Sequence, residues 1–393
     1  MKKRMIGLCA VSMMIALTGA AAAETVKIGV IAPFSGAFAR WGEQFQQSIA
    51  VYQKHNGDSV KGNKIEIVYR DVGGPDPAKS RQLAEELILR EKVQFLAGFA
   101  FTPNALSVAE LITEAKMPTV IFNAATSVIP RRSPMYVRAS FTLSQLTAPL
   151  AVWAAKGKYK KVVSVVSDYA PGHDGETVFV RVFKENGGEI VDAVRIPLST
   201  TDFAPFFERI LQQKPDAIFL FGPGGPSSVG MVNTWAARLK PAGIDLLTTN
   251  ETQEIDLPKI GKAAIDVIGS SHYTEVVDNP LNKKLRADLE AMFGKDRIPD
   301  TATVSAYDGM HMIYQVVSQL GPRPKAEDAV KLMSNMKFDS PRGPIMIDPE
   351  TRDIVQNVYL RRVVAQGDRL VNKNFDTIPM VKDPWKVWNP EKK

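Results

Sequence analysis

Short apolar runs alternate with longer amphipathic stretches along the first part of the chain. The short runs are rich in β-branched residues, as buried parallel strands are, and the longer stretches repeat apolar positions every three or four residues, as helices do. This alternation predicts right-handed βαβ units and a parallel sheet covered by helices. We expect strands at Val26–Ala32, Lys64–Arg70, Phe95–Gly98 and Thr119–Phe122, and helices near Ala39–His55, Pro77–Glu91 and Pro103–Lys116.

The same alternation then starts again, which predicts a second lobe rather than one long sheet. The expected strands are Val162–Ser167, Ile190–Arg195, Ala217–Phe221 and Leu246–Thr248, and the expected helices lie near Ser144–Ala155, Glu176–Asn186, Phe203–Gln213 and Ser227–Leu239.

The last part of the chain has a different pattern. A further strand at Val267–His272 leads into helices near Leu281–Phe293, Thr303–Leu320 and Ala326–Met333. After them, two apolar runs flank Asp348–Glu350 and predict a hairpin. The whole pattern predicts an α/β protein of two doubly wound lobes with parallel central sheets, joined by strands that cross between them.

The first residues have the features of a secretory signal peptide. Basic residues at positions 2–4 precede an apolar run that ends at Gly19, and Ala21–Ala23 offers an A-x-A cleavage site. We therefore expect cleavage after Ala23 and export to the periplasm. Cys9 lies inside the apolar run, so we do not expect a lipid anchor there.

Composition narrows the possible classes of function. Cys9 is the only cysteine, so the chain without its signal peptide has no disulfide and no thiol chemistry. The formal charge of +7 falls to +4 when the three basic residues at positions 2–4 are removed, and the other charges are interspersed. No basic patch for nucleic acid is visible, so we expect no nucleic-acid partner.

Sequence signatures of catalysis are absent. The four histidines do not form a metal-ligand spacing, and no G-x-S-x-G motif is present. The run "GPGGPSS" from Gly222 lacks the lysine of a phosphate-binding loop. These absences favour a binding protein with no cofactor and no metal over an enzyme.

The candidate binding residues of the first lobe follow its predicted strands, where open parallel sheets place ligands. Thr102 is expected to cap a helix that has Pro103 as its first residue, and its hydroxyl either attracts a carboxylate or serves only as the cap. The small polar residues of "FNAATS", from Phe122, follow the next strand. Trp41 lies after the first strand and faces either the core or a ligand.

The second lobe offers aromatic and acidic groups at matching places. Tyr169, Gly172 and His173 follow its first strand, and Glu251 and Glu254 follow its last. Either acid is suited to pair with an ammonium group, or is simply solvated. Polar groups on one lobe and aromatic or acidic groups on the other predict a cleft that closes on a small molecule.

The whole chain after the signal peptide resembles the type I periplasmic substrate-binding proteins of ABC importers, in the leucine/isoleucine/valine-binding group. The likeness rests on the order and spacing of "VKIGVIAPFSGAFARWGEQ", "KGNKIEIVYRD", "DPAKSRQLAEELI", "FNAATS" and "AYDGMH". It implies a monomer of two lobes, residues 24–141 with 275–356 and residues 142–274 with 357–393. It further implies three crossovers, near Arg138–Phe141, His272–Glu275 and Gln356–Arg361, and delivery of the ligand to a membrane permease.

The resemblance also implies residue roles. Thr102 stands at the place of a serine that binds the amino-acid carboxylate, and Ala124 and Thr126 stand at the carbonyl and hydroxyl that hold the ammonium and carboxylate. Trp41 stands where the family often has a tyrosine that walls the pocket. Glu251 matches the acid that pairs with the ammonium group.

Other positions depart from the leucine-binding pattern. Gly172 and Pro223 stand where that group has tyrosines, and Ala302 stands near the position at which that group has a phenylalanine in its pocket. Pro75 and Phe101 stand near the places of its disulfide, which is missing here. The loss of these aromatic side chains predicts a larger pocket, in which Phe101, Tyr169 or Tyr273 fill some of the space.

Two ligand classes therefore stay open, an apolar or branched-chain amino acid and an aromatic carboxylate. Glu251 discriminates between them, because a ligand without an amine would leave a buried acid unpaired. The leading hypothesis is a non-enzymatic periplasmic receptor that delivers a small carboxylate to an ABC permease. A sensory binding protein and a secreted hydrolase are the alternatives.

Overall fold

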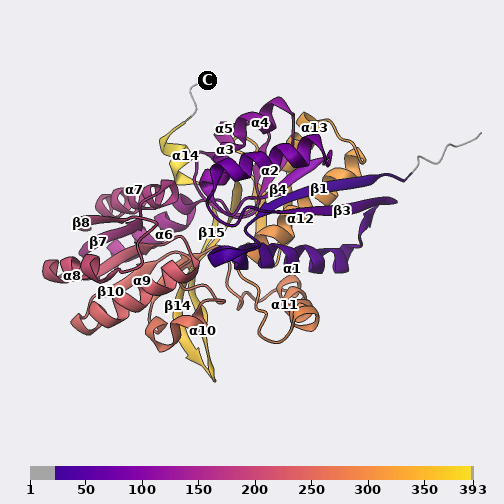
Figure 1. Cartoon of the computed structure of the whole chain (residues 1–393). Coiled ribbons are helices and arrows are strands. Elements are labelled where there is room, and N and C mark those ends of the chain that lie inside the picture. Colours follow the sequence, from indigo (N-terminus) through magenta and orange to yellow (C-terminus); the bar gives the residue numbers. More distant parts are fainter. Residues whose placement is uncertain (1–22, 391–393) are drawn as a thin grey trace, which may run out of the picture.

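The computed structural model describes residues 23–390 and consists of two α/β lobes (Figure 1). The predicted signal peptide lies outside the described residues except for Ala23. The late helices α11 (Pro280–Phe293) and α12 (Thr301–Leu320) pack against α1 (Ala39–Asn56) near the start of the chain, and α13 (Ala326–Ser334) packs against α12 (Figure 1). The first lobe is therefore built from two separate parts of the sequence.

The first lobe contains a six-stranded sheet in the order β2-β3-β1-β4-β5-β6, in which β2 alone is antiparallel. Because the chain moves outward from β1 to β3 and then returns to β4 on the other side of β1, the strand order reverses between β1 and β4. Such a switch point leaves a crevice at the carboxyl ends of the strands. The strands are β1 (Thr25–Ala32), β2 (Ser59–Val60), β3 (Asn63–Asp71), β4 (Phe95–Gly98), β5 (Thr119–Ile121) and β6 (Tyr136–Arg138), and the remaining helices are α1 (Ala39–Asn56), α2 (Pro77–Leu89), α3 (Thr102–Ser107), α4 (Ala109–Glu114) and α5 (Ile129–Arg132).

The second sheet has the same kind of switch point, between β7 and β9, in the order β12-β13-β14-β11-β10-β9-β7-β8 with β15 on β14. Two hydrophobic clusters cover its two faces, one against α6 and α7 and the other against α8 and α9. The strands are β7 (Lys161–Ser167), β8 (Glu189–Ile196), β9 (Ala217–Phe221), β10 (Asp245–Thr248), β11 (Ile268–Ser271), β12 (Lys337–Ser340), β13 (Gly343–Ile347), β14 (Ile354–Gln366) and β15 (Arg369–Val381), and the helices are α6 (Leu143–Lys156), α7 (Ala170–Glu185), α8 (Ala204–Gln213), α9 (Gly225–Arg238), α10 (Leu257–Ile260) and α14 (Pro384–Trp388).

The predicted fold class is confirmed, and the local structure differs from the prediction in several places. The expected helix from Pro103 is two short helices that break at Val108, where the Ser107 hydroxyl bonds back to the Asn104 carbonyl. Helix α7 begins at Ala170, so the expected loop around Gly172 is helical. Strand β15 was not predicted, because it is mostly exposed and lacks a regular apolar alternation.

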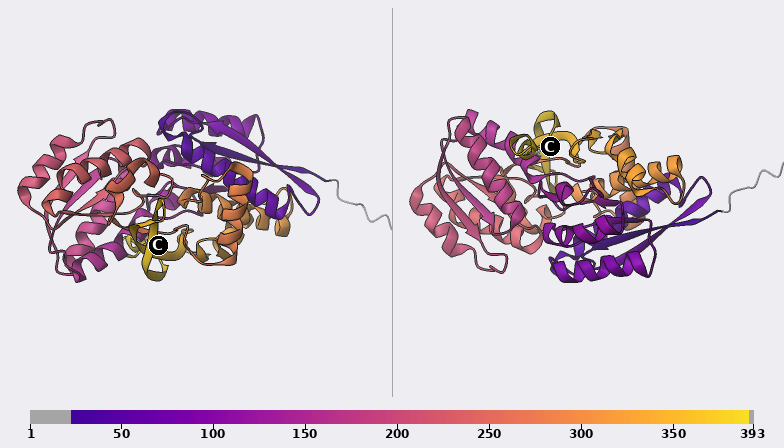
Figure 2. Two further views of the ribbon diagram at one scale, coloured as in Figure 1. Left: turned by 90° about the horizontal axis from the view of Figure 1, so that it is seen from below. Right: turned by 90° about the horizontal axis from the view of Figure 1, so that it is seen from above.

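Three crossovers join the lobes, and β14 forms the last of them. Its first residues pair with β13, and its later residues pair with β11 of the parallel second sheet. The two views of Figure 2 show the yellow C-terminal strands in the region between the lobes. The lobe boundaries predicted after residues 141, 274 and 356 stay predictions.

A buried arginine connects two of the crossovers. Arg342 is fully buried, and its guanidinium forms an ion pair with Asp308 of α12, at 2.6 Å from Nη2 to Oδ2. The same group donates to the carbonyls of Ala139 and Ser140 in the first crossover, and to the Gln356 side chain in the third. One side chain thus links α12 to segments of both the first and the third crossover.

We expect Arg342→Met to lower the free energy of unfolding by about 3–5 kcal/mol, because it leaves the buried Asp308 carboxylate without its cationic partner. Denaturant titration of the purified protein measures this change. The matched control is Arg362→Met, since Arg362 forms an exposed 3.7 Å pair with Asp266 and should contribute less than about 1 kcal/mol. Equal effects of the two substitutions would contradict a special role for Arg342.

Candidate ligand-binding cleft

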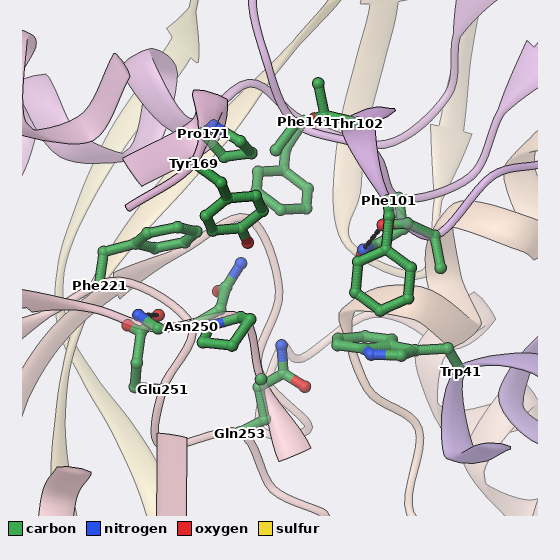
Figure 3. Close-up of a pocket in the computed structure, with 16 residues that line it drawn as sticks. Trp41, Phe101, Thr102, Phe141, Tyr169, Pro171, Phe221, Asn250, Glu251 and Gln253 are labelled. Carbon is green, nitrogen blue, oxygen red and sulfur yellow. Dashed lines mark hydrogen bonds between the residues drawn. The ribbon is translucent and has the colours of Figure 1, made fainter. Parts of the chain in front are cut away.

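A cavity lies between the lobes, at the carboxyl ends of strands from both sheets (Figure 3). It holds about 500 Å³ of space, its open mouth included. The lining residues follow β1, β4 and β5 in the first lobe and β7, β9 and β10 in the second, with Phe141 from the first crossover. They are Trp41, Ala100, Phe101, Thr102, Asn123, Ala125, Phe141, Tyr169, Pro171, Phe221, Gly222, Pro223, Gly224, Asn250, Glu251 and Gln253.

Aromatic side chains form opposite walls of this cavity. In Figure 3, Trp41 and Phe101 stand on one side and Tyr169 and Phe221 on the other. Phe101 packs edge-to-face on Phe38 with ring centroids 4.9 Å apart, and Tyr169 stacks on Phe221 at 6.1 Å. Trp41 belongs both to the core and to the site, because it is 4% exposed and lines the cavity.

Thr102 does not cap its helix. Helix α3 begins at Thr102, its N-cap is Phe101, and no side chain forms the cap hydrogen bond. The Thr102 hydroxyl instead lies 3.0 Å from the Thr126 hydroxyl. The expected capping role is therefore wrong, because the side chain turns toward the loop after β5.

The loop after β5 is held by an arginine that the sequence analysis did not single out. Arg138 is fully buried and donates to the carbonyls of Ala124 and Thr126, and also to Asp353 at 2.7 Å. Ala124 and Thr126 themselves are not among the lining residues, whereas their neighbours Asn123 and Ala125 are. The Ala124 carbonyl, predicted to hold an ammonium group, already has a guanidinium as its partner.

Glu251 lines the cavity and is 2% exposed, and its carboxylate is held by groups of its own lobe. It accepts hydrogen bonds from the backbone N–H groups of Gly222 and Thr249, both at 3.0 Å, and from the hydroxyls of Thr248 and Thr249. Three of these donors meet at Oε2, and only the Gly222 N–H group reaches Oε1. Burial raises the pKa of Glu251 above its ordinary value, and the same hydrogen bonds act against this rise.

The other predicted residues lie at varied distances from the cavity. Pro223 and Tyr169 line it, and burial together with the nearby Glu251 charge raises the pKa of the Tyr169 hydroxyl. Gly172 and Ala302 are buried and do not line it. At Gly172 a Cβ atom would lie 2.0 Å from the Ser167 carbonyl oxygen, so glycine lets α7 pack closely on β7.

Glu254 and His173, the other candidates of the second lobe, do not line the cavity either. Glu254 is buried 3.5 Å from Arg361, and burial raises the pKa of its carboxyl group above the usual range. His173 is partly exposed and lies 2.7 Å from Asp168.

Several lining residues were not predicted although they lie beside predicted ones. Asn250 and Gln253 each precede one of the two candidate acids, Glu251 and Glu254, in the loop after the strand Leu246–Thr248. Phe221 ends a predicted strand and Phe141 lies in a predicted crossover. A place just after the end of a strand was the signal that could have predicted these lining residues, because it applies to amide and aromatic side chains as much as to acids.

Within residues 23–390, no group of three or more His, Cys, Asp or Glu side chains is arranged to hold a metal ion. None of the helices in this range combines the length and the apolar character needed to cross a bilayer.

Comparison with known proteins gives matches over nearly the whole chain. The chain is 42% identical over 387 residues to Leu/Ile/Val-binding protein homolog 6 of Brucella melitensis, with 98% of this chain and 99% of the relative covered. A solute-binding protein of an ABC transporter from R. palustris, solved in complex with 4-hydroxybenzoate, is 44% identical with a TM-score of 0.91, over 93% of this chain and 100% of that one.

A second solved structure is also similar over nearly the whole chain. The solute-binding protein of an ABC transporter from Rhodopseudomonas palustris BisB5, in complex with 3,4-dihydroxybenzoic acid, is 40% identical with a TM-score of 0.88, over 92% of this chain and 99% of that one. Residues 25–368 match the family model described as periplasmic binding protein. The chain therefore belongs to the periplasmic binding protein family, in the leucine/isoleucine/valine-binding group of ABC-importer solute-binding proteins.

Proposed function

We propose that this protein is a non-enzymatic receptor for a benzoate-type aromatic carboxylate, which it delivers to the membrane permease of an ABC importer. The observation that carries the proposal is the state of Glu251. Its carboxylate borders an aromatic cavity but is held by four donors of its own lobe. An incoming ammonium group would have to compete with these donors for the carboxylate.

The first lobe gives a second argument against an amino-acid ligand. The Ala124 carbonyl accepts from the Arg138 guanidinium, so the position that the resemblance assigns to an ammonium partner already faces a cation. A buried ammonium without a partner is strongly disfavoured. A ligand without an amine avoids this cost.

The shape of the cavity favours a flat ring. Trp41 and Phe101 oppose Tyr169 and Phe221, and aromatic walls suit the faces and edges of a benzene ring. Two relatives of 40% or more identity were solved with 4-hydroxybenzoate and 3,4-dihydroxybenzoic acid. Their ligands support the same class for this chain.

We assign the carboxylate end of the ligand to the first lobe. The paired hydroxyls of Thr102 and Thr126 lie 3.0 Å apart, and Thr102 borders the cavity. One hydroxyl can donate to the other, which leaves the second proton free to donate to a carboxylate. The second lobe offers the Glu251 carboxylate instead, which repels an anion.

Ligand class is tested by a thermal-shift screen of the mature protein with 4-hydroxybenzoate, benzoate, leucine and phenylalanine. We expect an aromatic acid at about 100 times its Kd to raise Tm by several degrees, because it binds only the native state. Leucine and phenylalanine should give no shift. Stabilisation by leucine alone would contradict the proposal and favour the amino-acid alternative.

We expect Thr102→Val to weaken binding of the aromatic acid by about 1–3 kcal/mol, through loss of a charge-assisted hydrogen bond. Isothermal titration calorimetry measures the change. Thr113→Val is the matched control, because the Thr113 hydroxyl bonds to Ala109 and Ser133 away from the cavity. An unchanged Kd in Thr102→Val would remove this residue from the site.

A buried ion pair holds the two lobes together beside the cavity. Arg40 of α1 pairs with Asp256 of the second lobe, and its guanidinium lies 4.5 Å from the centre of the Trp41 ring. Gly224 of the second lobe fits against both, since a Cβ atom there would lie 2.9 Å from Trp41 Cζ2. We assign this contact to the closed, ligand-bound form.

Arg40→Met should raise the dissociation rate of the bound acid about tenfold, because a partner of a buried pair across an interface acts mainly on dissociation. Stopped-flow displacement measures this rate. Arg297→Met is the control, because Arg297 pairs with Glu43 within the first lobe and is partly exposed. A dissociation rate that Arg40→Met leaves unchanged would show that this pair does not hold the closed form.

A further inference from the structure

We propose that Gln253 and Trp41 together recognise a hydroxyl group on the aromatic ring, at the end of the ligand away from its carboxylate. This inference rests on the proposed function and deepens it by naming the chemistry of the second end. Figure 3 draws Thr102 at the top of the cavity and Gln253 at its lower edge, with Trp41 on the same lower side.

Gln253 reaches across the cleft. It lies on the loop after β10 of the second lobe, and its Nε2 atom donates to the Thr301 hydroxyl of the first lobe at 3.2 Å. The side chain is 3% exposed, and its Oε1 atom is buried without a hydrogen-bond partner. The contact with Thr301 holds the amide in place, so the unpartnered acceptor stays at the cavity wall.

Trp41 supplies the complementary group. Its indole Nε1 atom is a buried donor without a partner, and the indole lines the same cavity as Gln253. Arg40 covers the ring on one side and Gly224 packs against its edge. The donor is thus as firmly placed as the Gln253 acceptor.

One acceptor and one donor are best satisfied by a hydroxyl group. A hydroxyl donates one hydrogen bond and accepts another, whereas an ammonium only donates and a carboxylate only accepts. A buried polar atom without a partner is unfavourable, so a bound hydroxyl at this place gains by pairing with both the Gln253 acceptor and the Trp41 donor.

The acceptors of the second lobe also decide which end of the ligand lies there. Asn250 Oδ1 is a further buried acceptor without a partner on the cavity wall. Together with Gln253 Oε1 and the Glu251 carboxylate, it makes this wall unfavourable for an anion and favourable for a donor. The carboxylate is therefore directed to the first lobe and the hydroxyl to the second.

The test compares 4-hydroxybenzoate with benzoate by calorimetry, in the wild-type protein and in Gln253→Met and Trp41→Phe. We expect the wild type to bind 4-hydroxybenzoate at least about tenfold more tightly than benzoate, because a site built for a hydroxyl rejects the analogue that lacks it. Each substitution should reduce this ratio to about threefold or less, mainly by weakening 4-hydroxybenzoate.

Gln44→Met is the matched control. Gln44 is a buried glutamine of α1 with both amide atoms unpartnered, but it does not line the cavity. We expect Gln44→Met to keep the wild-type ratio, which shows that loss of a buried amide elsewhere does not change selectivity.

The outcomes separate this inference from the function on which it rests. Equal affinity of the wild type for the two acids, or an unchanged ratio in both Gln253→Met and Trp41→Phe, would overturn hydroxyl recognition and leave the aromatic-acid receptor standing. Absence of binding of either acid to the wild type would overturn both. A ratio lost in both variants and kept in Gln44→Met supports the inference.

Discussion

The buried ion pair between Arg342 and Asp308 is the constraint on which the arrangement of the lobes depends. A guanidinium taken out of water needs all its donors matched, and here the partners come from α12, the first crossover and the start of β14. Some of these segments lie far apart in the sequence, since Ala139 and Arg342 are separated by 203 residues. Holding them together gives the first and third crossovers a common anchor.

Within that frame, the cavity combines apolar walls with very few free polar atoms. Most polar groups near the cleft already have protein partners, as Glu251 has in four donors and Ala124 has in Arg138. The Glu251 carboxylate binds its own loop together through these donors. The free atoms on the cavity wall, among them Gln253 Oε1, Asn250 Oδ1 and Trp41 Nε1, are then the ones that can select a ligand. In such a site, specificity depends on which hydrogen bonds are missing as much as on which residues are present.

Much of the fold was predictable because its signals are local. The strands that were predicted with bounds in the two sheets end within about two residues of their expected ends, since a run of buried β-branched residues bounded by turn residues specifies a strand on its own. The short strands β2, β6 and β12 were not predicted. The start of α7 and the existence of β15 were less predictable, because each depends on another part of the chain. The start of α7 depends on the close approach of Gly172 to Ser167, and β15 exists because β14 offers it an edge. Neither requirement is visible in the hydrophobic pattern of the segment itself.

For the site, the sequence by itself determined the set of loops that face the cleft, because the carboxyl ends of parallel strands always meet at one edge. It placed Trp41, Thr102, Tyr169 and Glu251 in those loops. Only the tertiary structure decided how each side chain is used. The Thr102 hydroxyl turns to Thr126, Glu251 is satisfied by Gly222, and Gln253 bonds to Thr301 of the opposite lobe. Those partners are 24, 29 and 48 residues away, and no local pattern encodes a hydrogen bond between groups that folding alone brings together.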